Sequence, residues 1–141
     1  MNKKKIKIFT DGACSGNPGP AGIGFVIYDE DDNVIKECSE YLGEATNNIA
    51  EYTALIKALE SIKDKKHYKL IIYSDSELLV KQIKGVYKVK NKNLKKLYDK
   101  VLELIQGVDF ELIHIPREDN SYADKLAKKA IEDGYKSTTF K

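Results

Sequence analysis

The chain has 141 residues, of which 42% are hydrophobic and 33% charged, and its formal net charge is +2. This length suits a single domain, and we assign residues 1–135 to that domain and residues 136–141 to a short, partly disordered tail. No apolar run approaches the roughly 20 residues of a membrane span, and the basic N-terminus lacks the apolar stretch of a signal peptide, so we expect a soluble, cytoplasmic protein without membrane contacts.

Three strands are predicted at the start of the chain. Alternating side chains over residues 5–10 predict a strand that ends in a Gly/Pro-rich loop, residues 12–22. Residues 22–28 and 34–41 predict two further strands, because both are apolar and a polar turn joins them. The chain therefore opens with an antiparallel meander of three strands.

A helix follows this meander. Thr46 can cap it, and apolar residues recur at helical spacing as far as about Ile62. Glu51 continues one stripe of these apolar residues instead of standing on the polar side. A carboxylate in that position has to be paired, protonated or bound to a metal.

The second half of the chain alternates strands with helices. The continuously apolar residues 70–73 predict a central strand covered on both faces. Two helices (77–84 and 94–106), a strand (110–115) and a last helix capped by Asn120 then follow in order. The resulting fold class is α/β, with a five-stranded mixed sheet, three antiparallel strands then two parallel, flanked by about four helices.

Four acidic residues are predicted to converge at one edge of this sheet. The helical crossover makes the strands that precede Asp11 and Asp75 parallel, so both acids follow carboxyl ends at the same edge. Glu51 lies in the first two turns of the crossover helix and projects toward that edge. Asp124 lies in the first turn of the last helix, on the side that also carries Ala127.

Such a cluster requires cations, since four carboxylates without an equal number of bases repel one another. Oxygen ligands favour Mg²⁺ or Mn²⁺, and two such ions support hydrolysis of a phosphodiester. The alternative is that these acids are unrelated caps and turn residues.

Four motifs in this order resemble type 1 ribonuclease H over nearly the whole chain. They are Thr10-Asp11-Gly12-Ala13-Cys14 with Gly16-Asn17-Pro18-Gly19-Pro20, Thr46-Asn47-Asn48 with Glu51, Ser74-Asp75-Ser76, and Asp119-Asn120 with Ala123-Asp124 and Leu126-Ala127. The resemblance implies endonucleolytic cutting of RNA in RNA/DNA hybrids, by two metal ions on Asp11, Glu51, Asp75 and Asp124. It also implies that Gly12, Asn17, Thr46, Asn47, Asn48 and Ser76 bind the hybrid.

Two features depart from the best-known bacterial pattern. The connection between the second and third helices, residues 85–93, is too short for the basic handle of many relatives, although Lys88, Lys90 and Lys92 can supply part of its charge. A solvated lysine-rich face is the alternative explanation. Arg117, the only arginine, and His114 both precede the last helix, and both are candidate catalytic residues. We favour Arg117 for a role near the leaving group or product phosphate, because His114 lies in a predicted strand, where a structural role is the alternative.

The leading prediction is a monomeric, hybrid-specific endonuclease. Two alternatives remain open at this point: a broader nuclease that also cuts double-stranded RNA, and a non-catalytic module that binds hybrids. Retention of four acids argues against a pure binder, because an acidic cluster repels phosphates. A nucleotide-using enzyme of the actin-like class would need two copies of the fold, and this chain has room for one.

Overall fold

The computed structural model describes the backbone of residues 3–139 and the side chains of residues 3–134. Its strands are β1 (Lys4–Cys14), β2 (Gly19–Tyr28), β3 (Val34–Ala45), β4 (Tyr68–Ser74) and β5 (Asp109–His114). Its helices are α1 (Asn47–Glu60), α2 (Glu77–Ile83), α3 (Lys92–Ile105) and α4 (Ser121–Thr139), with short 3-10 turns η1 (Lys65–His67) and η2 (Arg117–Asn120). This order is the predicted one.

The five strands form one mixed sheet in the order β3-β2-β1-β4-β5. β1 pairs with β2 and β2 with β3 in antiparallel fashion, whereas β1 pairs with β4 and β4 with β5 in parallel. The predicted fold class is therefore confirmed. Because β1, β4 and β5 are parallel, their carboxyl ends meet at one edge of the sheet.

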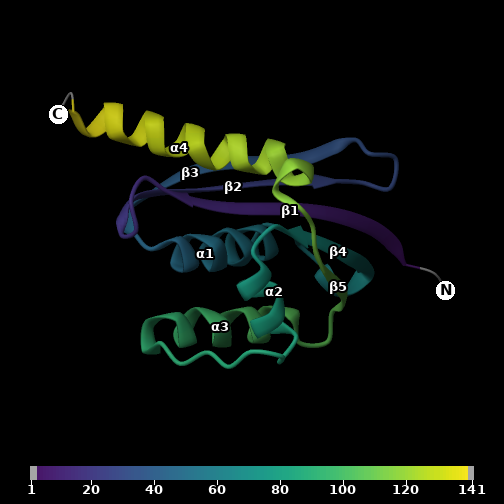
Figure 1. Cartoon of the computed structure of the whole chain (residues 1–141). Helices are drawn as coiled ribbons and strands as arrows, with labels where there is room; N and C mark the ends of the chain where they lie inside the picture. Colours follow the sequence, from purple (N-terminus) through teal and green to yellow (C-terminus); the bar gives the residue numbers. More distant parts are fainter. Residues whose placement is uncertain (1–2, 140–141) are drawn as a thin grey trace.

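Helices cover the two faces of the sheet unequally (Figure 1). α1, α2 and α3 lie on one face, where the main hydrophobic core includes Ile8, Leu55, Leu59 and Ile72. α4 lies on the other face, across β2, β3 and β1. Among residues 3–139, no helix has both the length and the apolar character that a membrane crossing requires.

The prediction that β4 is covered on both faces was wrong. Leu70 and Ile72 are buried under the helices of one face, but Ile71 and Tyr73 on the other face are only half-buried. The reason is the position of α4, which packs over the antiparallel half of the sheet and leaves the face of β4 partly open. An unbroken apolar run thus reflects one fully covered face and one partly covered face.

Close packing of α4 on β2 depends on glycine. A Cβ atom at Gly24 would overlap the carbonyl oxygen of Ala123, and one at Gly22 would crowd the carbonyl oxygen of Ala127. The backbone of α4 therefore rests directly on β2, which fixes the first turn of this helix, and Asp124 with it, relative to the sheet.

The C-terminal helix extends further along the chain than the sequence pattern suggested. Its backbone is helical to Thr139, although the interpretable apolar pattern ends before Tyr135. The predicted disordered tail lies partly outside the described residues, since residues 140–141 are not among them, and that prediction stays open.

Candidate functional site

Asp11 and Asp75 lie at the predicted edge of the sheet. Thr10 of β1 and Ser74 of β4 are register partners in the parallel pair, and each is followed directly by one of the two acids. Asp11 is buried, with only 4% of its surface exposed. The sequence-based pairing of these two strands is thus confirmed, and with it the proximity of the two carboxylates.

Glu51 reaches the same place from α1. Its Oε1 accepts a hydrogen bond of 2.6 Å from the backbone N–H of Gly12 on β1. One carboxylate oxygen from each of Asp11, Glu51 and Asp75 lies within 4.8 Å of the other two. Side chains from two strand ends and one helix therefore form a compact group of oxygen ligands.

Gly12 makes this approach of α1 possible. A Cβ atom at this position would overlap the backbone of Ala50 and Glu51. Thr46 caps the N-terminus of the same helix, because its hydroxyl accepts a hydrogen bond of 3.3 Å from the N–H of Ile49. The first turns of α1 are consequently held against β1, and Glu51 is directed to the strand edge.

Asp124 completes the site from the opposite face of the sheet. It lies in the first turn of α4 and lines, with the other three acids, a cleft of about 480 Å³. Its Oδ2 is 3.0 Å from the ammonium of Lys128, one turn further along the helix. Asp124 is not one of the three-oxygen group, but its carboxylate is close enough to Asp11 to form a side-chain hydrogen bond, which together with its charge helps to raise the pKa of Asp11.

The electrostatics of the cleft favour protons or cations. Burial, together with the charges of Glu51 and Asp75, raises the pKa of Asp11 to about 10. Burial also raises the pKa of Glu51 to about 8, although the N–H of Gly12 and the nearby Arg117 oppose this shift. Without a cation, these groups therefore hold protons at a pH where exposed carboxylates are ionised.

The donor set suits a hard divalent cation. Carboxylate oxygens are preferred ligands of Mg²⁺ and Mn²⁺, and a cation would replace the protons that burial and repulsion now favour. The thiol of Cys14 also lines the cleft, but it donates to the carbonyl of Ala45 at 3.1 Å. Among the described residues, no other group of acidic, histidine or cysteine side chains has this geometry.

Asn120 directly precedes α4, at the predicted cap position, but its side-chain oxygen accepts no hydrogen bond from the described residues. It belongs to η2, and its buried side chain donates to the carbonyl oxygen of Thr10 at 2.8 Å and to Oδ2 of Asp75 at 3.3 Å. The cap prediction was therefore wrong. Asn120 instead connects the chain before α4 to both strand ends, and so positions a carboxylate of the site.

Replacement of Asn120 by Ala is expected to destabilise the protein by about 1–3 kcal/mol, because the buried carbonyl of Thr10 loses its donor. Urea unfolding monitored by circular dichroism measures this cost. Asn93→Ala, at an exposed position in the first turn of α3, is the matched control and should change the stability by less than about 0.5 kcal/mol. If the two substitutions lowered the stability equally, Asn120 would not have the proposed role of anchoring the chain before α4 to β1.

The remaining predicted site residues are distributed around the cleft. Its lining includes Gly12, Asn47, Asn48, Ser76 and Arg117. Asn17 lies beside it, since its side-chain oxygen accepts a 3.0 Å hydrogen bond from the N–H of Asn47. His114 is exposed at the end of β5 and is not part of the lining.

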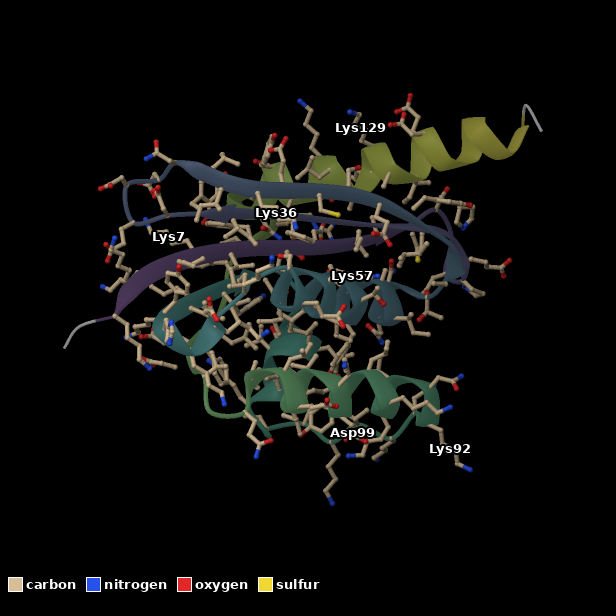
Figure 2. All side chains as sticks on the ribbon, turned by 180° about the vertical axis from the view of Figure 1, so that it is seen from behind. Lys7, Lys36, Lys57, Lys92, Asp99 and Lys129 are labelled. Carbon is tan, nitrogen blue, oxygen red and sulfur yellow. The ribbon has the colours of Figure 1, made fainter. Side chains whose placement is uncertain are left out.

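The three predicted phosphate-binding lysines lie outside the cleft. Lys88 and Lys90 are exposed in the connection between α2 and α3, and Lys92 begins α3. Figure 2 shows Lys92 at the end of α3, projecting away from the sheet. α3 begins at the end of the molecule where β1 finishes, so Lys92 lies toward that end of the fold (Figure 1).

Two charged residues of the cleft were missed by the sequence reasoning. Glu77 and Lys128 both line the cleft, and neither belongs to the motifs described above. For Lys128 the available signal was its spacing, since it follows Asp124 by four residues on a predicted helix.

Comparison with known proteins identifies relatives over most of the chain. A family model described as "Reverse transcriptase-like" matches residues 9–130. Ribonuclease HI of Halobacterium salinarum is 38% identical over 130 residues, in a match that covers 92% of this chain. Ribonuclease H of Prosthecochloris aestuarii is 39% identical over an alignment 150 residues long, which covers 93% of this chain and 98% of that protein. The chain spans 65% of the length of the halobacterial relative and 36% of mycobacterial proteins that it also matches.

A solved structure has the same architecture. LC11-RNase H1, isolated from compost by a metagenomic approach, matches with a TM-score of 0.87 at 46% identity, and the match covers 96% of this chain and 99% of that one. The same protein is also known in complex with an RNA/DNA hybrid, and that structure matches with a TM-score of 0.85 over 92% of this chain.

Proposed function

Because the chain belongs to the ribonuclease H family, with type 1 enzymes among its relatives, we propose that it is an endonuclease which hydrolyses the RNA strand of RNA/DNA hybrids. The observation that carries this proposal is the convergence of Asp11, Glu51 and Asp75 within 4.8 Å. Similarity to a protein whose complex with a hybrid is known supports the choice of substrate.

Asp11, Glu51, Asp75 and Asp124 would hold two Mg²⁺ or Mn²⁺ ions. When bound, such ions activate a water molecule and stabilise the leaving oxygen of an in-line displacement at phosphorus. The carboxylates would hold such ions at the strand edge, and Asn120 restrains Asp75 through its amide. The N–H of Gly12 fixes one oxygen of Glu51, so the carboxylate does not have to be ordered during the reaction.

The polar residues around the carboxylates would bind the hybrid. Gly12, Asn47, Asn48 and Ser76 line the cleft, and they offer backbone N–H groups, amides and a hydroxyl to sugars and phosphates. Recognition of the RNA strand requires contacts to 2′-hydroxyl groups, for which donors and acceptors of this kind are suited. Asn17 acts through Asn47, and Thr46 through the start of α1.

Lys88, Lys90 and Lys92 would contact phosphates at a distance from the cut site. A buried relay restrains their segment: the hydroxyl of Tyr52 donates to Gln82 at 2.7 Å, and the amide of Gln82 donates to the carbonyl of Lys88 at 3.4 Å. The connection is thus tied to α1, the helix that carries Glu51, which supports a defined position for these charges.

Arg117 is proposed to assist near the leaving group or the product phosphate. It lines the cleft, and its charge lowers the pKa of Glu51. His114 lies at the exposed end of β5 and does not line the cleft. It contributes to the cleft only indirectly, as a minor cause of the lowered pKa of Glu77. This placement favours Arg117 over His114 as the assisting residue, in agreement with the preference drawn from the sequence.

An end-labelled RNA/DNA hybrid tests the function directly. With Mg²⁺, and separately with Mn²⁺, we expect internal cuts in the RNA strand alone and none after chelation of the metal. Glu51→Gln should reduce cutting by at least about 100-fold, because one ligand of the site is lost. Glu60→Gln, an exposed position at the end of the same helix, is the matched control and should cut like the parent protein.

An RNA duplex and a DNA duplex of the same sequence distinguish the alternatives. Comparable cutting of the RNA duplex would identify a broader nuclease. Tight binding of the hybrid without any cut, in the presence of either metal, would identify a non-catalytic binding module and overturn the proposal.

A further inference from the structure

The charges that line the cleft are strongly unbalanced. The acids are Asp11, Glu51, Asp75, Glu77 and Asp124, and the bases are Arg117 and Lys128. A nucleic acid brings further negative charge to this surface, so the two bases are the cleft groups able to attract its phosphates. Arg117 already has a proposed role beside the reacting phosphate, whereas Lys128 has none.

Lys128 lies at the rim of the cleft, and its side chain is exposed to solvent. Its ammonium is 3.0 Å from Oδ2 of Asp124, and 68% of its side chain is exposed against 23% for Asp124. The spacing of four residues puts both side chains on one side of α4. A long, exposed side chain of this kind can change its partner with little cost, because an exposed ion pair contributes little stability.

We propose that Lys128 is a substrate-binding residue, whose ammonium exchanges the carboxylate of Asp124 for a backbone phosphate of the hybrid. This inference rests on the proposed function of the cleft. When a divalent cation neutralises Asp124, the ammonium loses its partner at the position where the nucleic acid arrives. Lys128 is therefore both a competitor of the cation at Asp124 and a counter-charge for the substrate.

The test compares Lys128→Ala with Lys129→Ala. Both substitutions remove one positive charge from neighbouring positions of α4. Lys129 is exposed but does not line the cleft, and Figure 2 shows it on the outer side of the helix. Both variants should fold, because each replaces an exposed lysine by a residue with higher helix propensity. The melting temperatures of the two proteins check this point.

Hybrid affinity is measured by fluorescence anisotropy over a range of salt concentrations with Mg²⁺ present, in the Asp11→Asn background so that the RNA is not cut. Lys128→Ala should weaken binding about three- to tenfold and reduce the slope of log K against log salt by about one, as expected for one lost phosphate contact. Lys129→Ala should leave the slope unchanged. Equal slopes in the two variants would overturn the phosphate contact.

Mg²⁺ binding to the nucleic-acid-free protein provides a second readout, measured by calorimetry. Lys128→Ala should bind Mg²⁺ more tightly than Lys129→Ala, because the ammonium that competes for Asp124 is absent. Equal Mg²⁺ affinities would overturn the exchange at Asp124. Failure of the parent protein to cut a hybrid would instead refute the proposed function, so the two failures can be told apart.

Discussion

Asp11→Asn is expected to reduce cutting of the RNA strand by about three orders of magnitude or more, while it raises the stability of the metal-free protein. Asp11 is buried among Glu51, Asp75 and Asp124, and their charges together with burial raise its pKa. Without a cation, Asp11 must therefore take up a proton for the protein to fold, whereas a neutral amide needs none. The same substitution removes a metal ligand. Activity and stability should therefore move in opposite directions, as is common where a site is arranged for catalysis.

Cleavage of an end-labelled hybrid with Mg²⁺ measures the first effect, and thermal unfolding in EDTA measures the second. Asp99→Asn is the matched control, because it makes the same substitution at an exposed residue of α3 whose carboxylate pairs with Lys95 at 3.1 Å. We expect this control to keep the parent activity and to change the stability by less than about 0.5 kcal/mol. Parent-like cutting by Asp11→Asn would exclude the carboxylate group from the chemistry.

The sequence was most informative where local geometry decides the outcome. Glu51 could be assigned to the inward side of α1 because helical periodicity places it in line with Leu55 and Ala58, and both of these residues are buried. Asp11 and Asp75 needed one further step, the handedness of the crossover, which implies parallel strands and is confirmed by their register.

Contacts between distant segments could not be predicted from the same patterns. Asn120 has the residue type and position of a helix cap, but its amide is used by Thr10, 110 residues earlier in the chain. Capping preferences depend only on the backbone next to the residue. They therefore cannot predict that a buried carbonyl far away in the sequence, here that of Thr10, needs a hydrogen-bond donor. Half-burial of Tyr73 is a similar case, since it depends on where α4 packs.

Asp124 lies between these extremes. Its position in the first turn of the last helix was predictable from the chain pattern, but its distance from the other acids depends on how α4 rests on β2. That contact is possible because Gly24 has no side chain; a Cβ atom there would overlap the carbonyl oxygen of Ala123. The glycines of β2, Gly22 and Gly24, do not by themselves indicate which helix packs against them.

The stability of the metal-free protein should fall as the pH rises from about 5 to about 9, and Mg²⁺ should reverse this trend. The pKa of folded Asp11 is raised to about 10 and that of Glu51 to about 8, from model values of 3.8 and 4.5. At a pH between the model and the raised pKa values of these two groups, the folded protein binds more protons than the unfolded chain. Stability therefore decreases with pH, by up to about 1.4 kcal/mol per pH unit for each excess proton.

Mg²⁺ should raise the melting temperature more at pH 9 than at pH 6, because cation binding at low pH has to displace protons from the same carboxylates. Melting temperatures in EDTA and in saturating Mg²⁺, recorded across this range, measure both effects. Asp11→Asn should flatten the EDTA curve, since it removes the group with the largest shift, whereas Asp99→Asn should preserve the parent slope. A melting temperature in EDTA that does not change with pH would contradict the proton-holding role of the cleft. A Mg²⁺ effect of equal size at pH 6 and pH 9 would show that the cation binds elsewhere, because only a site that exchanges protons for metal couples the two.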